Sequence, residues 1–172
     1  MSARPPELRI LVCGTAERGD DGAALAAISN VLPGLPDEVR GRIEVRRCEM
    51  LDVTDLLDVH DRESCIVIDT VVGVEPGEIV TMTLDDLARH PAGVAPRSSH
   101  ALSVDDALLI AEAVRGSLPP GLFVGIGGKW FGYGRRLSRA VKGSLPAYAA
   151  AIRRSIDDVL AASDRGAAPY QD

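Results

Sequence analysis

Short apolar runs alternate along the chain with amphipathic segments and turn residues. Continuous apolar runs are typical of strands buried on both faces of a parallel sheet, and apolar positions spaced by three or four residues are typical of helices. Strands are accordingly expected at 8–14, 42–47, 65–69, 78–84 and 121–126. Helices are expected at 23–32, 51–60, from Ser103 onward and at 137–162, where Pro146 can break the last one; 89–99 is expected to be a loop. This alternation predicts the α/β class, a three-layer α/β/α sandwich with a largely parallel sheet.

The length and composition fit one soluble domain. The chain has 172 residues, 46% of them hydrophobic and only 3% aromatic, so the core is expected to be aliphatic. We expect residues 1–172 to form a single domain, with 1–7 and 163–172 as flexible tails. No stretch resembles a signal segment or approaches the length of a membrane span, which predicts a cytoplasmic protein. The formal net charge of −6 and the dispersed basic residues argue against binding to nucleic acid.

The three cysteines, Cys13, Cys48 and Cys65, are far apart in the sequence. Their odd number and wide spacing suit neither a disulfide framework nor a zinc knuckle. We expect reduced, buried thiols, with Cys13 in the core at the end of the first strand and not acting as a nucleophile.

Three polar features follow predicted strands or precede a helix. Asp20 and Asp21 come after the first strand, Asp69 ends the 65–69 run, and His100 lies just before the Ser103 helix. In a parallel α/β sheet, ligands sit beyond the carboxyl ends of the strands, where these side chains should converge. Two carboxylates and one imidazole form a ligand set suited to a divalent transition metal.

Each of these residues also has an ordinary structural explanation. Acids at Asp20 and Asp21 are favoured at a helix start by the helix dipole. Asp69 fits a turn at a strand end, and His100 fits an exposed loop. The combination of the three features is therefore more informative than any one of them.

The order of the motifs resembles that of the hydrogenase-maturation endopeptidases. Arg-Gly-Asp-Asp-Gly at 18–22 is similar to the opening motif of that family, and Ile-Val-Ile-Asp-Thr-Val at 66–71, with Pro-Gly-Glu at 76–78, is similar to the second. Ser-Ser-His-Ala-Leu-Ser at 98–103 is similar to the third, and Val-Gly-Ile-Gly at 124–127 to the late strand and its turn. The resemblance runs in order from about Leu8 to Val141.

The resemblance implies a fold, an activity and a site. The fold would be phosphorylase/hydrolase-like, and the partner would be the precursor of a hydrogenase large subunit, whose C-terminal extension the enzyme removes. Asp21, Asp69 and His100 would engage nickel already present in that precursor, so the metal arrives with the substrate and no organic cofactor is needed. Contact with the nickel would show that the precursor has received its metal before the peptide bond is cleaved irreversibly.

The first loop departs from the family pattern. The family has Gly-x-Gly-Asn followed after two or three residues by Gly-Asp-Asp/Glu-Gly, whereas the loop at 14–19 is about two residues shorter and lacks the Asn. Glu17 stands near the place of the missing amide, and an ionised carboxylate can only accept hydrogen bonds. The candidate catalytic groups are therefore Asp21, Asp69, His100 and Glu17, and the sequence does not name the attacking group.

Two alternatives of other classes stay open. The shortened loop favours a non-catalytic, chaperone-like module that binds a metalloprotein precursor without cutting it. A nucleotide-binding domain is disfavoured because the first loop carries Glu17, Asp20 and Asp21 where a phosphate would require backbone amides and a Lys. A serine hydrolase or a zincin is disfavoured because the chain has no Gly-x-Ser-x-Gly elbow and no His-Glu-x-x-His motif.

Overall fold

Five strands form one sheet within residues 6–90 and 103–166, the part of the chain that the computed structural model describes. They are β1 (Leu8–Cys13), β2 (Ile43–Cys48), β3 (Ser64–Val71), β4 (Ile79–Thr83) and β5 (Gly121–Gly127), in the order β2-β1-β3-β5-β4. All neighbouring pairs are parallel except β4 and β5, which run antiparallel at one edge. The predicted α/β class and largely parallel sheet are confirmed.

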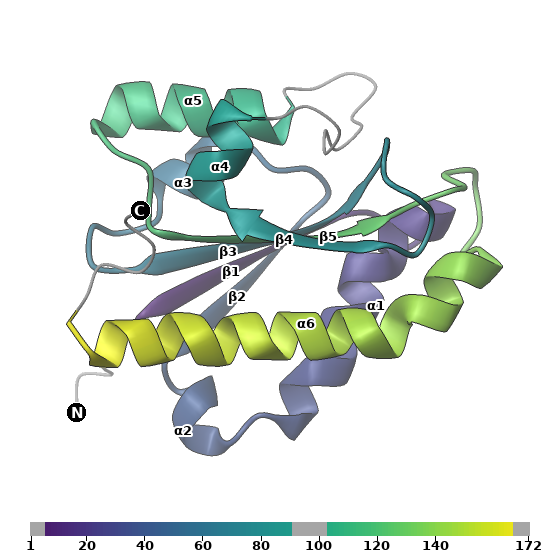
Figure 1. Ribbon diagram of the computed structural model, residues 1–172, viewed down its shortest axis with the longest axis horizontal. Coiled ribbons are helices and arrows are strands. Elements are labelled where there is room, and N and C mark those ends of the chain that lie inside the picture. Colours follow the sequence, from purple (N-terminus) through teal and green to yellow (C-terminus); the bar gives the residue numbers. More distant parts are fainter. Residues whose placement is uncertain (1–5, 91–102, 167–172) are drawn as a thin grey trace.

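Helices cover both faces of this sheet (Figure 1). The helices α1 (Ala23–Val31) and α6 (Arg139–Asp164) lie on one face, and α3 (Val53–Leu57), α4 (Leu84–Arg89) and α5 (Val104–Arg115) lie on the other. The short α2 (Asp37–Arg40) and two 3-10 turns, η1 (Gly19–Gly22) and η2 (Leu32–Gly34), complete the described elements. None of the helices in the described ranges is long and apolar enough to cross a bilayer.

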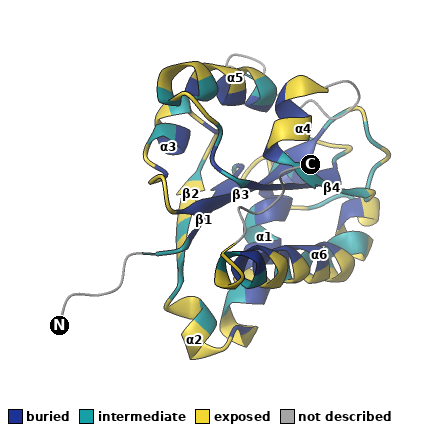
Figure 2. Cartoon of the chain, turned by 60° about the vertical axis from the view of Figure 1, so that its left-hand side comes forward, coloured by how far each residue is buried: buried dark blue, intermediate teal, exposed yellow. Residues whose placement is uncertain are grey.

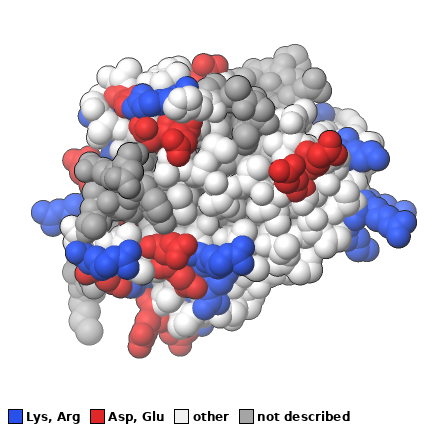
Figure 3. Space-filling view, viewed as in Figure 1, with Lys and Arg blue, Asp and Glu red and all other residues white. Residues whose placement is uncertain are grey.

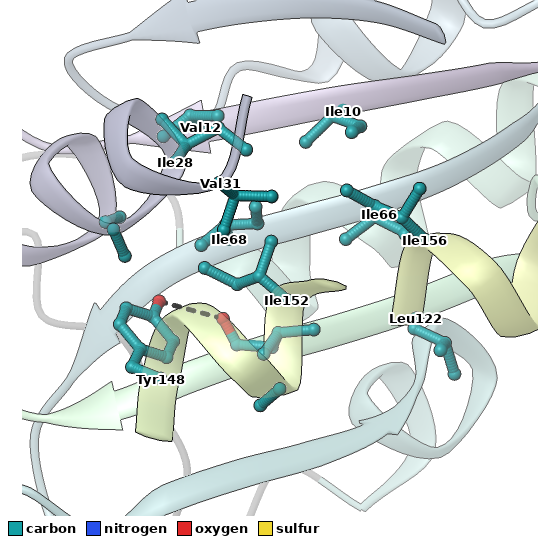
Figure 4. Close-up of a cluster of buried hydrophobic side chains, with 14 of the residues drawn as sticks. Ile10, Val12, Ile28, Val31, Ile66, Ile68, Leu122, Tyr148, Ile152 and Ile156 are labelled. Atoms are coloured by element: carbon teal, nitrogen blue, oxygen red, sulfur yellow. Dashed lines mark hydrogen bonds between the residues drawn. The ribbon is translucent and has the colours of Figure 1, made fainter. Parts of the chain in front are cut away.

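The central strands are buried on both faces, as Figure 2 shows for β1 and β3. Successive side chains of a strand alternate between the faces. Ile10 and Ile66 therefore pack with α1 and α6, while Leu11 and Val67 pack with α3, α4 and α5. Figure 4 shows the first of these cores, which is almost entirely aliphatic, as the composition predicts.

Several predicted boundaries are wrong. The third strand continues to Val71, so Asp69 lies inside it. The helix expected at 51–60 is only Val53–Leu57, because the capping box of Asp52 and Asp55 starts it late. An unpredicted helix, α4, follows β4 directly because the Thr83 side chain accepts a hydrogen bond from the Asp86 backbone N–H.

The last helix is not broken at Pro146 and extends further than expected. Pro146 lies in its first third at an exposed position, so water can reach the carbonyl group that loses its helical donor. The helix ends at Asp164, inside the predicted tail, where Asp164 forms an ion pair with Arg42 at 2.6 Å. Glu7, from the predicted N-terminal tail, also binds Arg42 and is part of the folded structure.

Candidate functional site

The loop after β1 folds back so that its own backbone shapes a site at the carboxyl edge of the sheet. Gly14 has a φ of 129°, and a Cβ at this position would lie 2.0 Å from the carbonyl oxygen of Asp21. Only glycine fits so close to a neighbouring backbone. The Thr15 backbone N–H donates to Asp21 Oδ2 at 2.7 Å, which fixes the direction of this carboxylate.

Asp20 and Asp21 have different tasks although they are adjacent. Asp20 is fully buried, and its carboxylate accepts three backbone hydrogen bonds: from Lys129 at 2.8 Å, Trp130 at 3.0 Å and Ser138 at 2.6 Å. Burial acts to raise the pKa of Asp20, but these three donors outweigh it and lower the pKa below its ordinary value. Asp20 therefore holds the turn after β5 and the start of α6, and Asp21 is left to face the site.

Trp130 is held by the same loop. Gly19, with a φ of 58°, lies so close to the Trp130 indole that a Cβ would approach ring atom Cε3 to 2.4 Å. The Asp20 backbone N–H also donates to the Trp130 carbonyl at 2.8 Å. The indole is thus fixed in place although 44% of the residue is exposed.

Asp69 is the most strongly perturbed acid of this edge. It lies two residues before the end of β3 and is only 9% exposed. Burial raises the pKa of Asp69 to about 7, opposed by a hydrogen bond from the Thr70 backbone N–H and assisted by the negative charge of Asp21. The Asp69 carbonyl accepts a hydrogen bond from the buried Tyr148 hydroxyl at 3.0 Å, which ties β3 to α6.

Asp21 and Asp69 form a carboxylate pair. Burial also raises the pKa of Asp21, against the hydrogen bond from Thr15 and the charge of Arg18. Two nearby carboxylates that are poorly solvated retain a proton more readily than either would alone. Such a pair can hold a proton near neutral pH and can ionise fully when a cation arrives.

The other two candidates have different positions. His100 lies outside the described residues; the first described residue after it is Ser103, which caps α5. Glu17 does not join the carboxylate pair, because its side chain is exposed and forms an ion pair with Arg135 at 2.5 Å. Within the described ranges, no three or more His, Cys, Asp or Glu side chains gather in a way that could hold a metal ion.

Cys13 and Cys48 lie opposite each other on the parallel strands β1 and β2, with their sulfur atoms 3.2 Å apart. The sequence spacing did not predict this contact, which depends on strand register. The hydrogen bond with Cys48 and burial raise the pKa of the Cys13 thiol well above its ordinary value. All three cysteines are free thiols, and Cys13 is poorly suited to act as a nucleophile.

The arrangement of strands and helices is that of the hydrogenase maturation proteases. The chain superposes on HybD from E. coli with a TM-score of 0.67 and 18% identity, covering 93% of each chain. For HybD from Thermococcus kodakarensis the TM-score is 0.60 and the identity 22%, covering 86% of this chain and 97% of that one. HycI from the same organism gives 0.63 and 16%, covering 88% and 92%.

At these identities the likeness establishes the shared fold. No protein-family model matches the chain, and none of the curated protein sequences matches it. What the site does must therefore be argued from its own residues.

Proposed function

We propose that this protein is a cytoplasmic endopeptidase that removes the C-terminal extension of a nickel-loaded hydrogenase large-subunit precursor. The observation that carries the proposal is the pair of poorly solvated carboxylates, Asp21 and Asp69, at the carboxyl edge of the sheet. The fold adds support, since the three solved structures described above, which share it, are named as maturation proteases or endopeptidases of hydrogenases.

Asp21, Asp69 and His100 would bind the nickel that the precursor carries. His100 precedes Ser103 by three residues, which limits their separation to about 10 Å in an extended chain. The helix that Ser103 caps ends shortly before β5 begins, and β5 is parallel to β3, so this helix begins toward the carboxyl edge of the sheet. The proposal requires that the segment before Ser103 bring the imidazole to the two carboxylates.

The raised pKa of Asp69 suits recognition of a loaded precursor. Without a cation, the pair keeps a proton near neutral pH, because burial disfavours the second negative charge. A divalent ion brought by the substrate favours the ionised form and displaces that proton. A precursor without nickel brings no cation to favour the ionised carboxylate pair. This difference would distinguish the loaded precursor from the empty one before cleavage.

A non-catalytic, chaperone-like binding module is the second candidate. Glu17, which stands near the place of the missing loop Asn, is bound to Arg135 at the surface and supplies no amide donor to the carboxylate pair. A protein of this fold that grips a loaded precursor without cutting it would be compatible with that feature.

The experiment that separates the candidates is incubation with a nickel-loaded large-subunit precursor, with mass spectrometry to detect loss of its C-terminal peptide. We expect wild type to cleave and His100→Ala to lose cleavage by at least about 100-fold, since loss of a residue that only orients a metal ligand already costs about 10- to 100-fold. His60→Ala is the matched control, because His60 is exposed, and it should cleave normally. An unchanged rate in His100→Ala would exclude the metal-recognition role, and tight binding without cleavage by wild type would favour the chaperone-like module.

Glu17→Asn tests whether the first loop still takes part in cleavage. Because the Glu17 side chain is exposed and paired with Arg135, we expect the substitution to change the cleavage rate by less than about twofold. A large increase would mean that an amide at this position contacts the scissile peptide in the complex. Single-turnover cleavage rates at saturating enzyme provide the measurement.

A further inference from the structure

The distribution of charge along the chain is uneven. Between residues 113 and 156 the sequence contains eight basic and no acidic residues, although the whole chain has 25 acidic and 19 basic residues. The middle of this segment comprises the turn after β5 and the first turns of α6. Figure 3 shows Lys and Arg side chains gathered at the right-hand end of the molecule, where Figure 1 places the start of α6.

Five of these eight basic residues have no carboxylate partner among the described residues, and four of the five lie between residues 129 and 142. Lys129, Arg136, Arg139 and Lys142 are exposed, and among the described residues none of them takes part in an ion pair. Arginines elsewhere in the fold are commonly paired, as Arg42 is with two carboxylates. Unpaired like charges close together repel one another, and an anionic partner would relieve this repulsion.

These side chains surround two adjoining hollows that share Arg139. One has a volume of about 760 Å³ and is lined by Lys129, Trp130 and Arg139, with Ala140, Gly143 and Ser144 of α6. The other, of about 670 Å³, is lined by Arg135, Arg136, Arg139 and Lys142, together with Leu137 and Leu145. We call the two hollows together the basic hollow. Small side chains of α6 line the first hollow, and cationic side chains line both.

Trp130 gives the basic hollow a fixed apolar surface. Its indole is held against Gly19, while nearly half of the residue remains exposed. Exposed aromatic side chains that are already immobile lose little entropy on binding and are common anchors of protein interfaces. A partner therefore meets an aromatic contact beside a row of cations.

The basic hollow adjoins the carboxylate pair. The Asp20 carboxylate binds the backbone of Lys129, Trp130 and Ser138, which are lining residues, and the next residue is Asp21. Thr70, the neighbour of Asp69, donates its hydroxyl hydrogen to the Asp20 carbonyl at 2.8 Å. An extended polypeptide crossing this edge of the sheet could contact both places.

We propose that the basic hollow binds an acidic segment of a protein partner, and, resting on the proposed function, that this segment belongs to the precursor. Carboxylates of the segment would pair with Arg136, Arg139 and Lys142. The turn of Gly77 packs against Ala140 and Ser144, two of the lining residues, and is flanked by the acidic residues Glu75 and Glu78. Acidic residues of the segment would therefore bind on the side of the cations, away from this turn. A nucleic acid fits less well, because its continuous negative charge would also meet those acids.

The test measures binding of fluorescein-labelled decaglutamate by anisotropy at low ionic strength. The triple variant Arg136→Glu, Arg139→Glu, Lys142→Glu should bind at least about tenfold more weakly than wild type. The matched control is Arg47→Glu, Arg62→Glu, Arg154→Glu, which changes the net charge equally at exposed residues outside the hollow and should bind within about threefold of wild type. Unlabelled decaglutamate should also shield Trp130, the only Trp, from quenching by acrylamide.

Equal weakening in both triple variants, or no binding by wild type, would overturn the proposal. Tighter binding of a ten-nucleotide oligothymidylate than of decaglutamate would assign the surface to nucleic acid instead. With a precursor as substrate, the first triple variant should raise KM with little change in kcat. Absence of cleavage by wild type would count against the proposed endopeptidase and leave the peptide-binding result standing, so the two failures are distinguishable.

Discussion

Asp20→Ala is expected to lower the free energy of unfolding by about 4 kcal/mol, because three backbone donors lose a charged acceptor in a buried place. The donors belong to Lys129, Trp130 and Ser138, which lie far from Asp20 in the sequence. Losing the acceptor leaves these N–H groups unsatisfied and frees the turn from the first loop. Denaturation by urea at pH 7, followed by far-ultraviolet circular dichroism, gives the measurement.

Asp21→Ala is the matched control for that experiment. It removes the same charge from the adjacent position, but among the described residues only Thr15 donates hydrogen bonds to the Asp21 carboxylate. We expect a loss of no more than about 1 kcal/mol, since only the hydrogen bonds from Thr15 are removed and a poorly solvated charge is relieved. Similar losses in both variants would mean that the two acids share the structural task.

The sequence predicts the sheet, and the proximity of the candidate residues Asp21 and Asp69, for a simple physical reason. Strands buried on both faces must be apolar throughout, so the polar residue at Asp69 stands out against its neighbours. The carboxyl ends of parallel strands meet at one edge, which brings Asp69 and the loop of Asp21 together without knowledge of any contact. That part of the site follows from pattern and topology alone.

The different roles of Asp20, which binds three backbone N–H groups, and Asp21, which belongs to the carboxylate pair, could not be predicted in this way. The two side chains are identical, and the difference arises from donors more than a hundred residues away. The same holds for Trp130, whose role depends on Gly19, and for the contact of Cys13 with Cys48, which depends on the register of β1 and β2. The helix α4 was missed although Thr83 and Asp86 carry a readable cap signal, because the apolar alternation of β4 continues into Leu84.

Asp69→Asn is expected to stabilise the protein at alkaline pH while removing precursor cleavage. In the folded state burial raises the pKa of Asp69 to about 7, whereas the unfolded chain should lose this proton near the ordinary value of about 3.9. Between these values the unfolded state releases the proton first, so wild-type stability falls as the pH rises from about 4 to about 7 and stays low above that. At about 1.4 kcal/mol per pKa unit, the neutral Asn should be more stable than wild type by about 4 kcal/mol at pH 8 and by almost nothing at pH 4.

The pH dependence separates this effect from an ordinary packing change. Asn keeps the acceptor for the Thr70 backbone N–H and the volume of the buried side chain, so a packing effect would be the same at every pH. Urea denaturation at pH 5 and pH 8 should show a smaller loss of stability between the two pH values in Asp69→Asn than in wild type; equal losses would contradict the raised pKa. Loss of cleavage in the same, more stable variant would then be due to the missing charge, because an Asn cannot supply the negative oxygen that a divalent cation requires. The ionised Asp69 side chain lowers the stability of the folded protein relative to a neutral Asn. The protein thus has a carboxylate at this position at a cost in folding stability.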